Sequence, residues 1–302
     1  MKHILIAIAF VICWSSGFVG SLLAGDNASP TGLLAWRYIV TASLLGVVVV
    51  GLHACAGSAR QRLVPSLAPI DVVHQIVIGV LSHAIFLGAV FTASDTGIDP
   101  GITSLVCSLQ PLLVAVLSAR FWGDPFNGRM LVGLVLGLTA VGLAAGSIDF
   151  SSTAIISLLL PPVALLGLSC SALLERAWKP RASIVQALAI QTATGAVIFT
   201  AVAVTTGQMG VRVNASLVLA LLWLVFLSGI GGYASYTACL RTIGPTTTSV
   251  LLFLTPPVTS LWTWLMFDQP IGAGQAAGMM LGLVAVALTV RGQRQQNSAS
   301  KV

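Results

Sequence analysis

Charged residues are scarce in this chain, and their scarcity excludes a surface built to face water. Only 7% of its 302 residues are charged, 57% are hydrophobic, and the mean hydropathy is +0.99. Soluble domains carry about 25% charged residues. The apolar residues run in long unbroken blocks, whereas membrane β-barrels show short alternating segments. The sequence therefore predicts a bundle of membrane-spanning helices whose surrounding partner is the lipid bilayer.

Residue patterns that carry out chemistry are missing as well. The chain has no Gly-x-x-x-x-Gly-Lys-Ser/Thr loop, no His-Glu-x-x-His pattern, no aspartate-rich cluster and no potassium-filter sequence. Its five cysteines show neither metal-ligand spacing nor a disulfide framework. The net charge of +6 is spread over short loops as single basic residues, unlike a nucleic-acid interface. We therefore expect no cofactor, no metal site, no nucleic-acid partner and no enzymatic activity.

Ten apolar stretches of about 20 residues predict ten transmembrane helices. They cover residues 3–24, 31–52, 72–93, 100–120, 127–147, 153–175, 183–206, 216–240, 245–267 and 271–291. The first stretch begins like a signal peptide, but it is long enough to span a bilayer, so we expect it to be the first helix. The short connections leave no room for a domain outside the membrane, and residues 292–302 are predicted to form a disordered cytoplasmic tail.

The distribution of basic residues predicts the orientation of the bundle. If the N-terminus is cytoplasmic, the outer loops hold Arg212 alone among basic residues, together with Asp26, Asp95, Asp99, Asp149 and Asp268. The inner segments collect Lys2, Arg60, Arg62, Arg120, Arg129, Arg176, Lys179, Arg181, Arg241, Arg291, Arg294 and Lys301. Basic residues favour the cytoplasmic side of a membrane. The sequence therefore predicts a multi-pass protein of the cytoplasmic (inner) membrane with both termini in the cytoplasm.

The chain also repeats itself. An offset of 145 residues lays Thr92–Leu143 on Thr237–Leu288 without a gap. The matched pairs are Pro100 with Pro245, Thr103 with Thr248, Ser104 with Ser249, Pro111 with Pro256, Pro125 with Pro270, Gly133 with Gly278, and Gly137 with Gly282. The repeats are predicted to be residues 1–147 and 153–291, with five helices each. An odd number of helices inverts the second unit, so we expect an inverted-topology repeat with a small-molecule site between the halves near the midplane.

These residues resemble a known module. The motifs that carry the resemblance are Pro100…Thr103-Ser104…Pro111, Trp122-Gly123-Asp124-Pro125 and Gly133-x-x-x-Gly137 with their copies in the second half, preceded by Trp14-Ser15-Ser16-Gly17-Phe18 and Trp36-Arg37-Tyr38. Together they look like the duplicated EamA module, except that Gln269 stands where the first half has Asp124. The resemblance implies the ten-helix branch of the drug/metabolite transporter superfamily. Within that branch, the chain looks most like the YddG-type exporters of aromatic amino acids.

Prolines interrupt two equivalent predicted helices. Pro111 and the pair Pro256-Pro257 each remove an amide donor and release the carbonyl four residues earlier. A static packing kink explains this pattern, but its recurrence in both halves favours a hinge or a bend that lines a cavity. Gln110 and Thr255 directly precede these bends and are candidate substrate contacts.

Two ionisable side chains lie inside predicted spans. His83 is near the centre of the third span, on one face with Phe86 and Val90. Such a residue indicates a functional site, unless it is a neutral histidine bonded to a neighbour. Arg37, next to Tyr38, either snorkels to the outer interface or holds a substrate carboxylate.

Further polar and aromatic side chains are candidate substrate contacts, although helix packing explains each of them equally well. They are Trp14 and Ser15 in the first span, Ser169 in the sixth, and Tyr233 and Tyr236 on one face of the eighth.

Three functions agree with these patterns. The first is a secondary transporter that exports small aromatic or hydrophobic metabolites by alternating access. The second is a facilitator or channel-like pore, which shares the fold but lacks exclusive inward-open and outward-open states. A membrane enzyme is third, because no span carries a confident carboxylate. The same lack favours uniport or exchange over proton coupling. The oligomeric state is open, and a monomer is compatible with the sequence.

Overall fold

The structure is a computed structural model that describes residues 2–54, 64–123, 128–145, 155–242, 248 and 251–299. These residues form helices joined by short connections. The described part of the chain contains no strand, only an isolated antiparallel bridge between Ala28 and Val211. The all-α class predicted from the sequence is confirmed.

The helices follow the predicted segments closely. In the first half they are α1 (Lys2–Ser15), α2 (Gly20–Ala24), α3 (Pro30–Ala54), α5 (Pro69–Gly79), α6 (Phe86–Asp95), α7 (Pro100–Ser108), α8 (Gln110–Trp122) and α9 (Gly128–Ala145). In the second half they are α10 (Leu160–Trp178), α11 (Ile184–Thr205), α12 (Ala215–Leu222), α13 (Gly232–Thr242), α15 (Thr255–Phe267) and α16 (Ala273–Ala299). The 3₁₀ turns η1 (Gly25–Asn27) and η3 (Ile155–Leu159) and the π-helices η2 (Val80–Ile85) and η4 (Trp223–Gly231) connect some of them.

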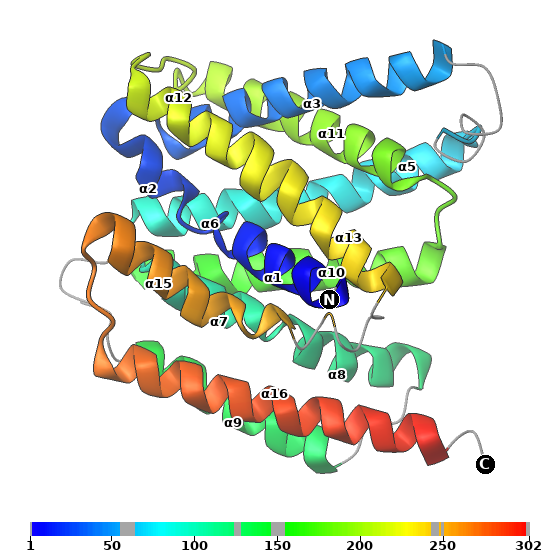
Figure 1. Ribbon diagram of the computed structural model, residues 1–302, viewed down its shortest axis with the longest axis vertical. Helices are drawn as coiled ribbons and strands as arrows, with labels where there is room; N and C mark the ends of the chain where they lie inside the picture. The colour runs from blue at the N-terminus through cyan, green and yellow to red at the C-terminus, as the bar shows by residue number, and fades with distance from the viewer. Residues whose placement is uncertain are drawn as a thin grey trace.

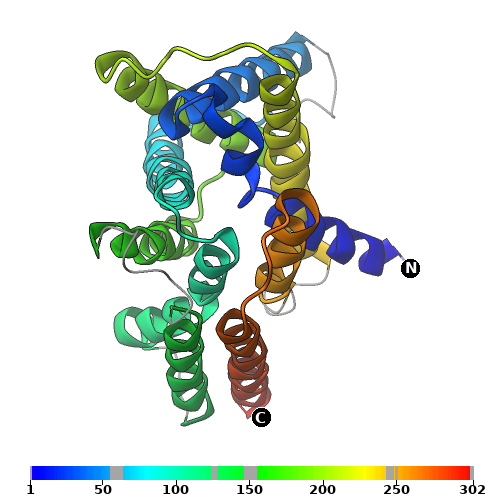
Figure 2. The same cartoon turned by 90° about the vertical axis from the view of Figure 1, so that its left-hand side faces the viewer.

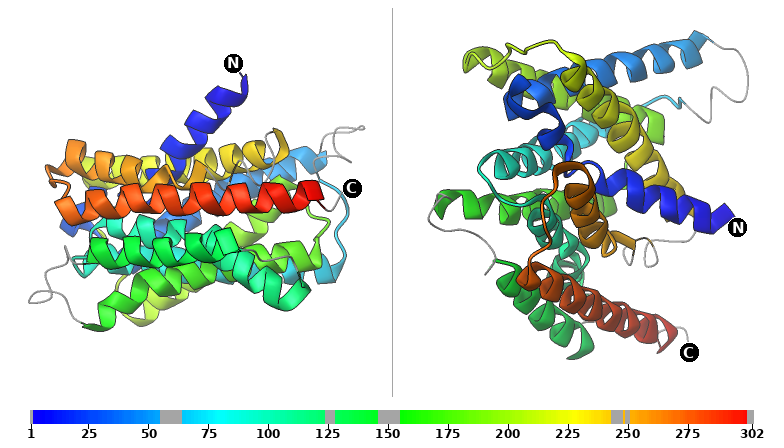
Figure 3. Two further views of the ribbon diagram at one scale, coloured as in Figure 1. Left: turned by 90° about the horizontal axis from the view of Figure 1, so that it is seen from below. Right: turned by 60° about the vertical axis from the view of Figure 1, so that its left-hand side comes forward.

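Helices from the two halves pack against each other at both ends of the bundle. In Figure 1, α3 and α11 lie side by side at the top, and α9 and α16 pair at the bottom. Between these pairs, α1 packs against α13 and α15, and α10 packs against α6, α7 and α8. Figures 2 and 3 show the N-terminal end of α1 reaching outward from the other helices. The halves are therefore interleaved along the whole bundle.

The outer surface is apolar. Val47, Val197 and Met280 are among many large hydrophobic side chains that are more than 60% exposed, at 72%, 71% and 65%. Such a surface is unfavourable in water but suits hydrocarbon. Buried positions are instead rich in Ser, Thr and Gln. The molecule therefore buries many polar side chains together with its apolar core and leaves large apolar side chains on its surface.

The first predicted span is broken, not continuous. The axes of α1 and α2 meet at 58° across the short segment between Ser15 and Gly20. A Cβ on Gly17 would lie 2.6 Å from Ser228 Oγ, so η4 passes very close to the break. Glycine permits this approach because it has no side chain.

Fewer helices qualify as membrane spans than the ten predicted. Among the described residues, six helical segments are long and apolar enough to cross a membrane, or seven if α1 and α2 count as one span. Shorter apolar helical stretches lie at Leu131–Leu143 and Ala273–Val284. The second of these stretches belongs to α16, which continues to Ala299. The tail that we predicted to be disordered from residue 292 is therefore helical over most of its length.

Two π-helices occupy equivalent places in the repeat. Moving Val80–Ile85 by the 145-residue offset places it on residues 225–230, inside Trp223–Gly231. In the second π-helix, a Cβ on Gly229 would lie 2.8 Å from the carbonyl oxygen of Leu224, five residues earlier. The widened turn thus favours glycine there. π-Helices are rare and often occur at functional sites.

The proline bends are equivalent in geometry as well. Leu109 separates α7 from α8 with φ −74° and ψ −3°, and its counterpart Leu254 precedes α15 with φ −80° and ψ −11°. A proline follows each of them by two residues, where it fits the start of a helix. The two helices also end alike, in left-handed residues at Gly123 (φ 67°) and Asp268 (φ 51°). The 145-residue offset relates Leu109 to Leu254 and Gly123 to Asp268.

Candidate functional site

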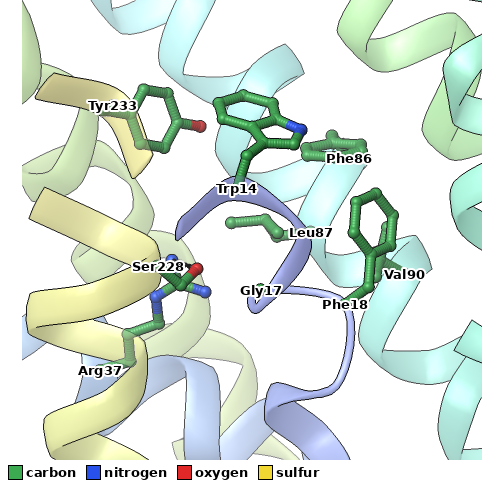
Figure 4. Close-up of a pocket in the computed structure, with 9 residues that line it drawn as sticks. All are labelled: Trp14, Gly17, Phe18, Arg37, Phe86, Leu87, Val90, Ser228 and Tyr233. Atoms are coloured by element: carbon green, nitrogen blue, oxygen red, sulfur yellow. Dashed lines mark hydrogen bonds between the residues drawn. The ribbon is translucent and has the colours of Figure 1, made fainter. Parts of the chain in front are cut away.

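A small cavity brings together residues from distant parts of the chain. We call it the Arg37 chamber; its walls are Trp14, Gly17, Phe18, Arg37, Phe86, Leu87, Val90, Ser228 and Tyr233 (Figure 4). They come from α1 and the break after it, and from α3, α6, η4 and α13. The cavity volume is about 20 Å³, which holds about one water molecule. The chamber is therefore a small space between an arginine and several aromatic rings.

Arg37 is buried and incompletely paired. Its side chain is 3% exposed, so it does not snorkel to the interface. Nη2 donates a long hydrogen bond of 3.4 Å to Ser228 Oγ, and the guanidinium carbon lies 5.6 Å from the centre of the Tyr38 ring. Nη1 has no hydrogen-bond partner among the described residues. An unsatisfied buried donor costs about 1–3 kcal/mol, and more when charged. The chamber thus contains a strong donor that is available to an anion.

His83 lies behind the chamber in a hydrogen-bonded network. Its Nδ1 is 2.7 Å from Tyr38 Oη and 3.4 Å from Tyr233 Oη, and its Nε2 is 3.1 Å from Gln191 Oε1. Gln191 Nε2 donates to Gln75 Oε1 at 2.6 Å. With this amide orientation, Nε2 of His83 carries the proton and Nδ1 accepts from tyrosine. The imidazole is then neutral, and it positions two tyrosines.

Small residues allow this network to form between four elements. Tyr38 lies on α3, His83 on η2, Gln191 on α11 and Gln75 on α5. A Cβ on Gly195 would lie 2.9 Å from Tyr38 Cδ1. The close packing of α3 on α11 thus depends on the missing side chain.

A larger cavity adjoins the Arg37 chamber. We call it the vestibule; its volume is about 590 Å³, within the range of small-molecule pockets. It is lined by Trp14, Ile78, Ser82, Gln110, Leu168, Ser171, Ala172, Glu175, Arg176, Ala182, Ile184, Ala187, Leu188, Gln191, Tyr233, Tyr236 and Leu252. Trp14 and Tyr233 line both cavities, and their ring centroids are 5.4 Å apart. These two rings form the shared wall.

A third cluster joins α7 to α15 and α16. Oδ1 of Asp99 accepts from the amides of Gly101 and Ile102 at 2.7 and 3.2 Å and from Gln275 Nε2 at 2.6 Å. Gln275 Nε2 also donates to Ser260 Oγ at 3.1 Å. Burial raises the pKa of Asp99, and the three hydrogen bonds oppose this shift. We call these residues the Asp99 cluster; Asp99 and Gln275 line a further cavity of about 320 Å³.

The structure groups most of the residues proposed from the sequence. Trp14, Arg37, Phe86 and Tyr233 line the chamber, and Gln110 and Tyr236 line the vestibule with Trp14 and Tyr233. Tyr38 and His83 belong to the hydrogen-bonded network that contacts Tyr233 in the chamber wall. Ser15, Ser169 and Thr255 are buried outside the described walls of both cavities. Pro111 lies in the first turn of α8, and Pro256 and Pro257 lie in that of α15.

Several residues of the site escaped the sequence analysis. Ser228 is the counterpart of His83 at the 145-residue offset, so the repeat could have identified it. Gln75 and Gln191 are amides within apolar spans, and buried polar groups there need partners. Glu175 is the last residue of the predicted span 153–175, and the sequence analysis did not count it as a carboxylate within a span.

Comparisons with known proteins find a matching family profile, a distant relative and a similar fold. The sequence profile of the EamA-like transporter family matches residues 1–146 and 154–291. A protein of Escherichia coli (strain K12), named "Probable amino-acid metabolite efflux pump", is 23% identical over 305 residues, which cover 97% of this chain and 96% of the relative. A solved structure titled "Crystal structure of protein" matches with a TM-score of 0.67 at 16% identity, over 95% of this chain and 96% of that one. This last likeness concerns the fold alone.

Proposed function

The chain belongs to the EamA-like transporter family, and from this premise we propose that it exports aromatic or other hydrophobic amino acids by alternating access through the Arg37 chamber. Membership and the efflux-pump relative identify a membrane transporter of metabolites and not an enzyme. The substrate, the direction and the mechanism are our proposal.

The buried guanidinium of Arg37 is the observation that carries this proposal. Its Nη1 lacks a partner among the described residues, and its one side-chain hydrogen bond is long. A carboxylate accepts two parallel hydrogen bonds from a guanidinium and neutralises its charge. Trp14, Phe18 and Phe86 surround the same space with apolar surface. A carboxylate joined to a hydrophobic side chain satisfies both features.

The chamber must widen to accept such a substrate. Its present volume is about 20 Å³, whereas sites for small molecules measure about 300–1,000 Å³. Trp14 and Tyr233 separate it from the vestibule, so displacement of these rings would join the two cavities. Arg176 lines the vestibule and belongs to the predicted cytoplasmic side. In our proposal this conformation is inward-open, with the outer side closed by the Asp99 cluster.

Two inverted units are a common basis of alternating access, and the matched irregularities support two such units here. We propose ten spans: α1 with α2, α3, α5 to α6, α7 with α8, α9, α10, α11, α12 to α13, α15 and α16. The proline bends at Pro111 and at Pro256-Pro257 then act as paired hinges. Both termini lie in the cytoplasm, and the protein resides in the inner membrane.

A facilitator or channel-like pore is the alternative. A pore needs a continuous passage in one conformation, whereas the described cavities are separated by the rings of Trp14 and Tyr233. This separation favours alternating access. Since His83 is engaged as a neutral group, we propose uniport or exchange.

Counterflow in proteoliposomes tests the proposal. Vesicles loaded with unlabelled phenylalanine should accumulate labelled phenylalanine transiently when they contain the protein. Arg37→Gln should reduce the initial rate at limiting substrate by about 10-fold to 100-fold, because one charge-assisted interaction is worth about 1.5–3 kcal/mol. The control is Arg212→Gln, which removes an arginine that does not line the chamber. Equal rates for Arg37→Gln and the wild type, or no counterflow of any aromatic amino acid, would overturn the proposal.

A further inference from the structure

We propose a second recognition site in the vestibule, where Glu175 binds the ammonium group of the substrate. This inference rests on the proposed function and narrows the substrate class to zwitterions and amines. Among the described residues that line the vestibule, Glu175 is the only carboxylate. Glu175 lies inside the candidate span Ile156–Trp178, and an ionisable residue within a membrane span that faces a cavity indicates a functional site.

Glu175 faces open space. Its side chain is exposed and lines the vestibule. An ionised carboxylate accepts hydrogen bonds at both oxygens and donates none. Glu175 therefore offers acceptor capacity toward the cavity.

The neighbouring arginine is turned toward another helix. Arg176 Nη1 donates to Ser118 Oγ at 2.9 Å, and its guanidinium carbon lies 5.2 Å from the centre of the Trp122 ring. Both contacts are with α8. The guanidinium of Arg176 thus packs against α8.

Aromatic rings complete the site. Tyr236 lines the vestibule, and its ring centroid is 5.3 Å from that of Trp14 and 5.5 Å from that of Phe10. Tyr233 also contacts Trp14 and lines the same cavity. The faces of tyrosine and tryptophan attract ammonium groups. A carboxylate beside such faces selects a cation over an anion.

The two charged side chains divide recognition between the two cavities. Glu175 lines the vestibule and Arg37 lines the chamber, with Trp14 and Tyr233 between them. A substrate that enters from the vestibule meets Glu175 before Arg37. Anionic acids without an amine gain no attraction from Glu175 at this first contact.

Three probes of equal aromatic size separate the two recognition sites. They are phenylalanine, 2-phenylethylamine, which lacks the carboxylate, and 3-phenylpropanoate, which lacks the amine. Their dissociation constants are measured by calorimetry on the full chain in lipid nanodiscs. The variants are Glu175→Gln and the charge-retaining Glu175→Asp. Asp26→Asn, which removes an exposed carboxylate distant from the vestibule walls, is the matched control.

Glu175→Gln should weaken binding of 2-phenylethylamine and phenylalanine about tenfold, since it removes one charge-assisted hydrogen bond. Binding of 3-phenylpropanoate should be unchanged or tighter. Glu175→Asp should retain most of the amine affinity, and Asp26→Asn should match the wild type.

The inference is overturned if the wild type does not bind 2-phenylethylamine or if Glu175→Gln binds it equally well. The proposed function fails separately if neither carboxylate probe binds the wild type. Amine binding that depends on Glu175 would then still support the cation site.

Discussion

Gln191→Leu should expose the energetic role of the buried network. The leucine removes both hydrogen bonds of Gln191, so His83 Nε2 and Gln75 Oε1 lose their partners. His83 and Gln75 are each 1% exposed, so water does not replace the hydrogen bonds that they lose.

The expected loss follows from these two bonds. An orphaned buried group costs about 1–3 kcal/mol, but hydrogen bonds between membrane helices average only about 0.6 kcal/mol with a maximum near 1.7. Two such bonds therefore predict a total destabilisation of about 1–3 kcal/mol. The substitution should also affect the Arg37 chamber, because His83 without Gln191 no longer holds the hydroxyl of Tyr233 in position. Affinity for phenylalanine should fall severalfold.

The assay is reversible unfolding in mixed detergent micelles, compared with Gln208→Leu as an exposed control. Gln75→Leu and the double variant complete a cycle, in which the double variant should be less unstable than the sum of the single ones. Stability of Gln191→Leu equal to the control, together with additive effects in the cycle, would refute the reasoning.

Two further predictions concern packing and charge. Gly195→Ala should destabilise the protein by about 1–3 kcal/mol because its methyl group meets the ring of Tyr38. Gly46→Ala, with open space around it, should be neutral or stabilising. Equal melting temperatures of the two variants would contradict this prediction. Asp99→Asn keeps the accepting Oδ1 but removes the charge. Because burial raises the pKa of Asp99 in the folded protein, ionisation opposes folding, so the wild type should lose stability relative to Asp99→Asn as the pH rises from the ordinary aspartate pKa through the raised one. Melting curves from pH 4 to pH 8 that showed the wild type gaining stability over the variant would contradict the sign.

The sequence predicted the positions of the helices because apolar length and turn residues are local signals. It also predicted the bends at Pro111 and Pro256, since a missing amide interrupts a helix wherever it lies. The break between α1 and α2 was missed. No proline marks it, and only the packing of η4 against Gly17 makes it visible.

The site was harder to predict than the fold. Arg37 had two interpretations, and its burial excludes snorkelling, while its binding of a substrate carboxylate stays a prediction. Ser15, Ser169 and Thr255 lie away from both cavities because the face that a residue presents depends on helix rotation, about 100° per residue. A π-helix shifts that rotation further, so a regular helical period does not correctly predict the face on which His83 lies.

The central claim is that the free donor of Arg37 is reserved for a substrate carboxylate. The most direct test is the melting temperature of Arg37→Gln, with and without saturating phenylalanine. A ligand at 100 times its Kd stabilises the folded state by about 2.7 kcal/mol. We predict that the ligand-free variant melts at the same temperature as the wild type or higher, since a poorly paired buried charge is removed, and that its stabilisation by phenylalanine disappears. A variant that melts earlier and keeps the full stabilisation would contradict the account.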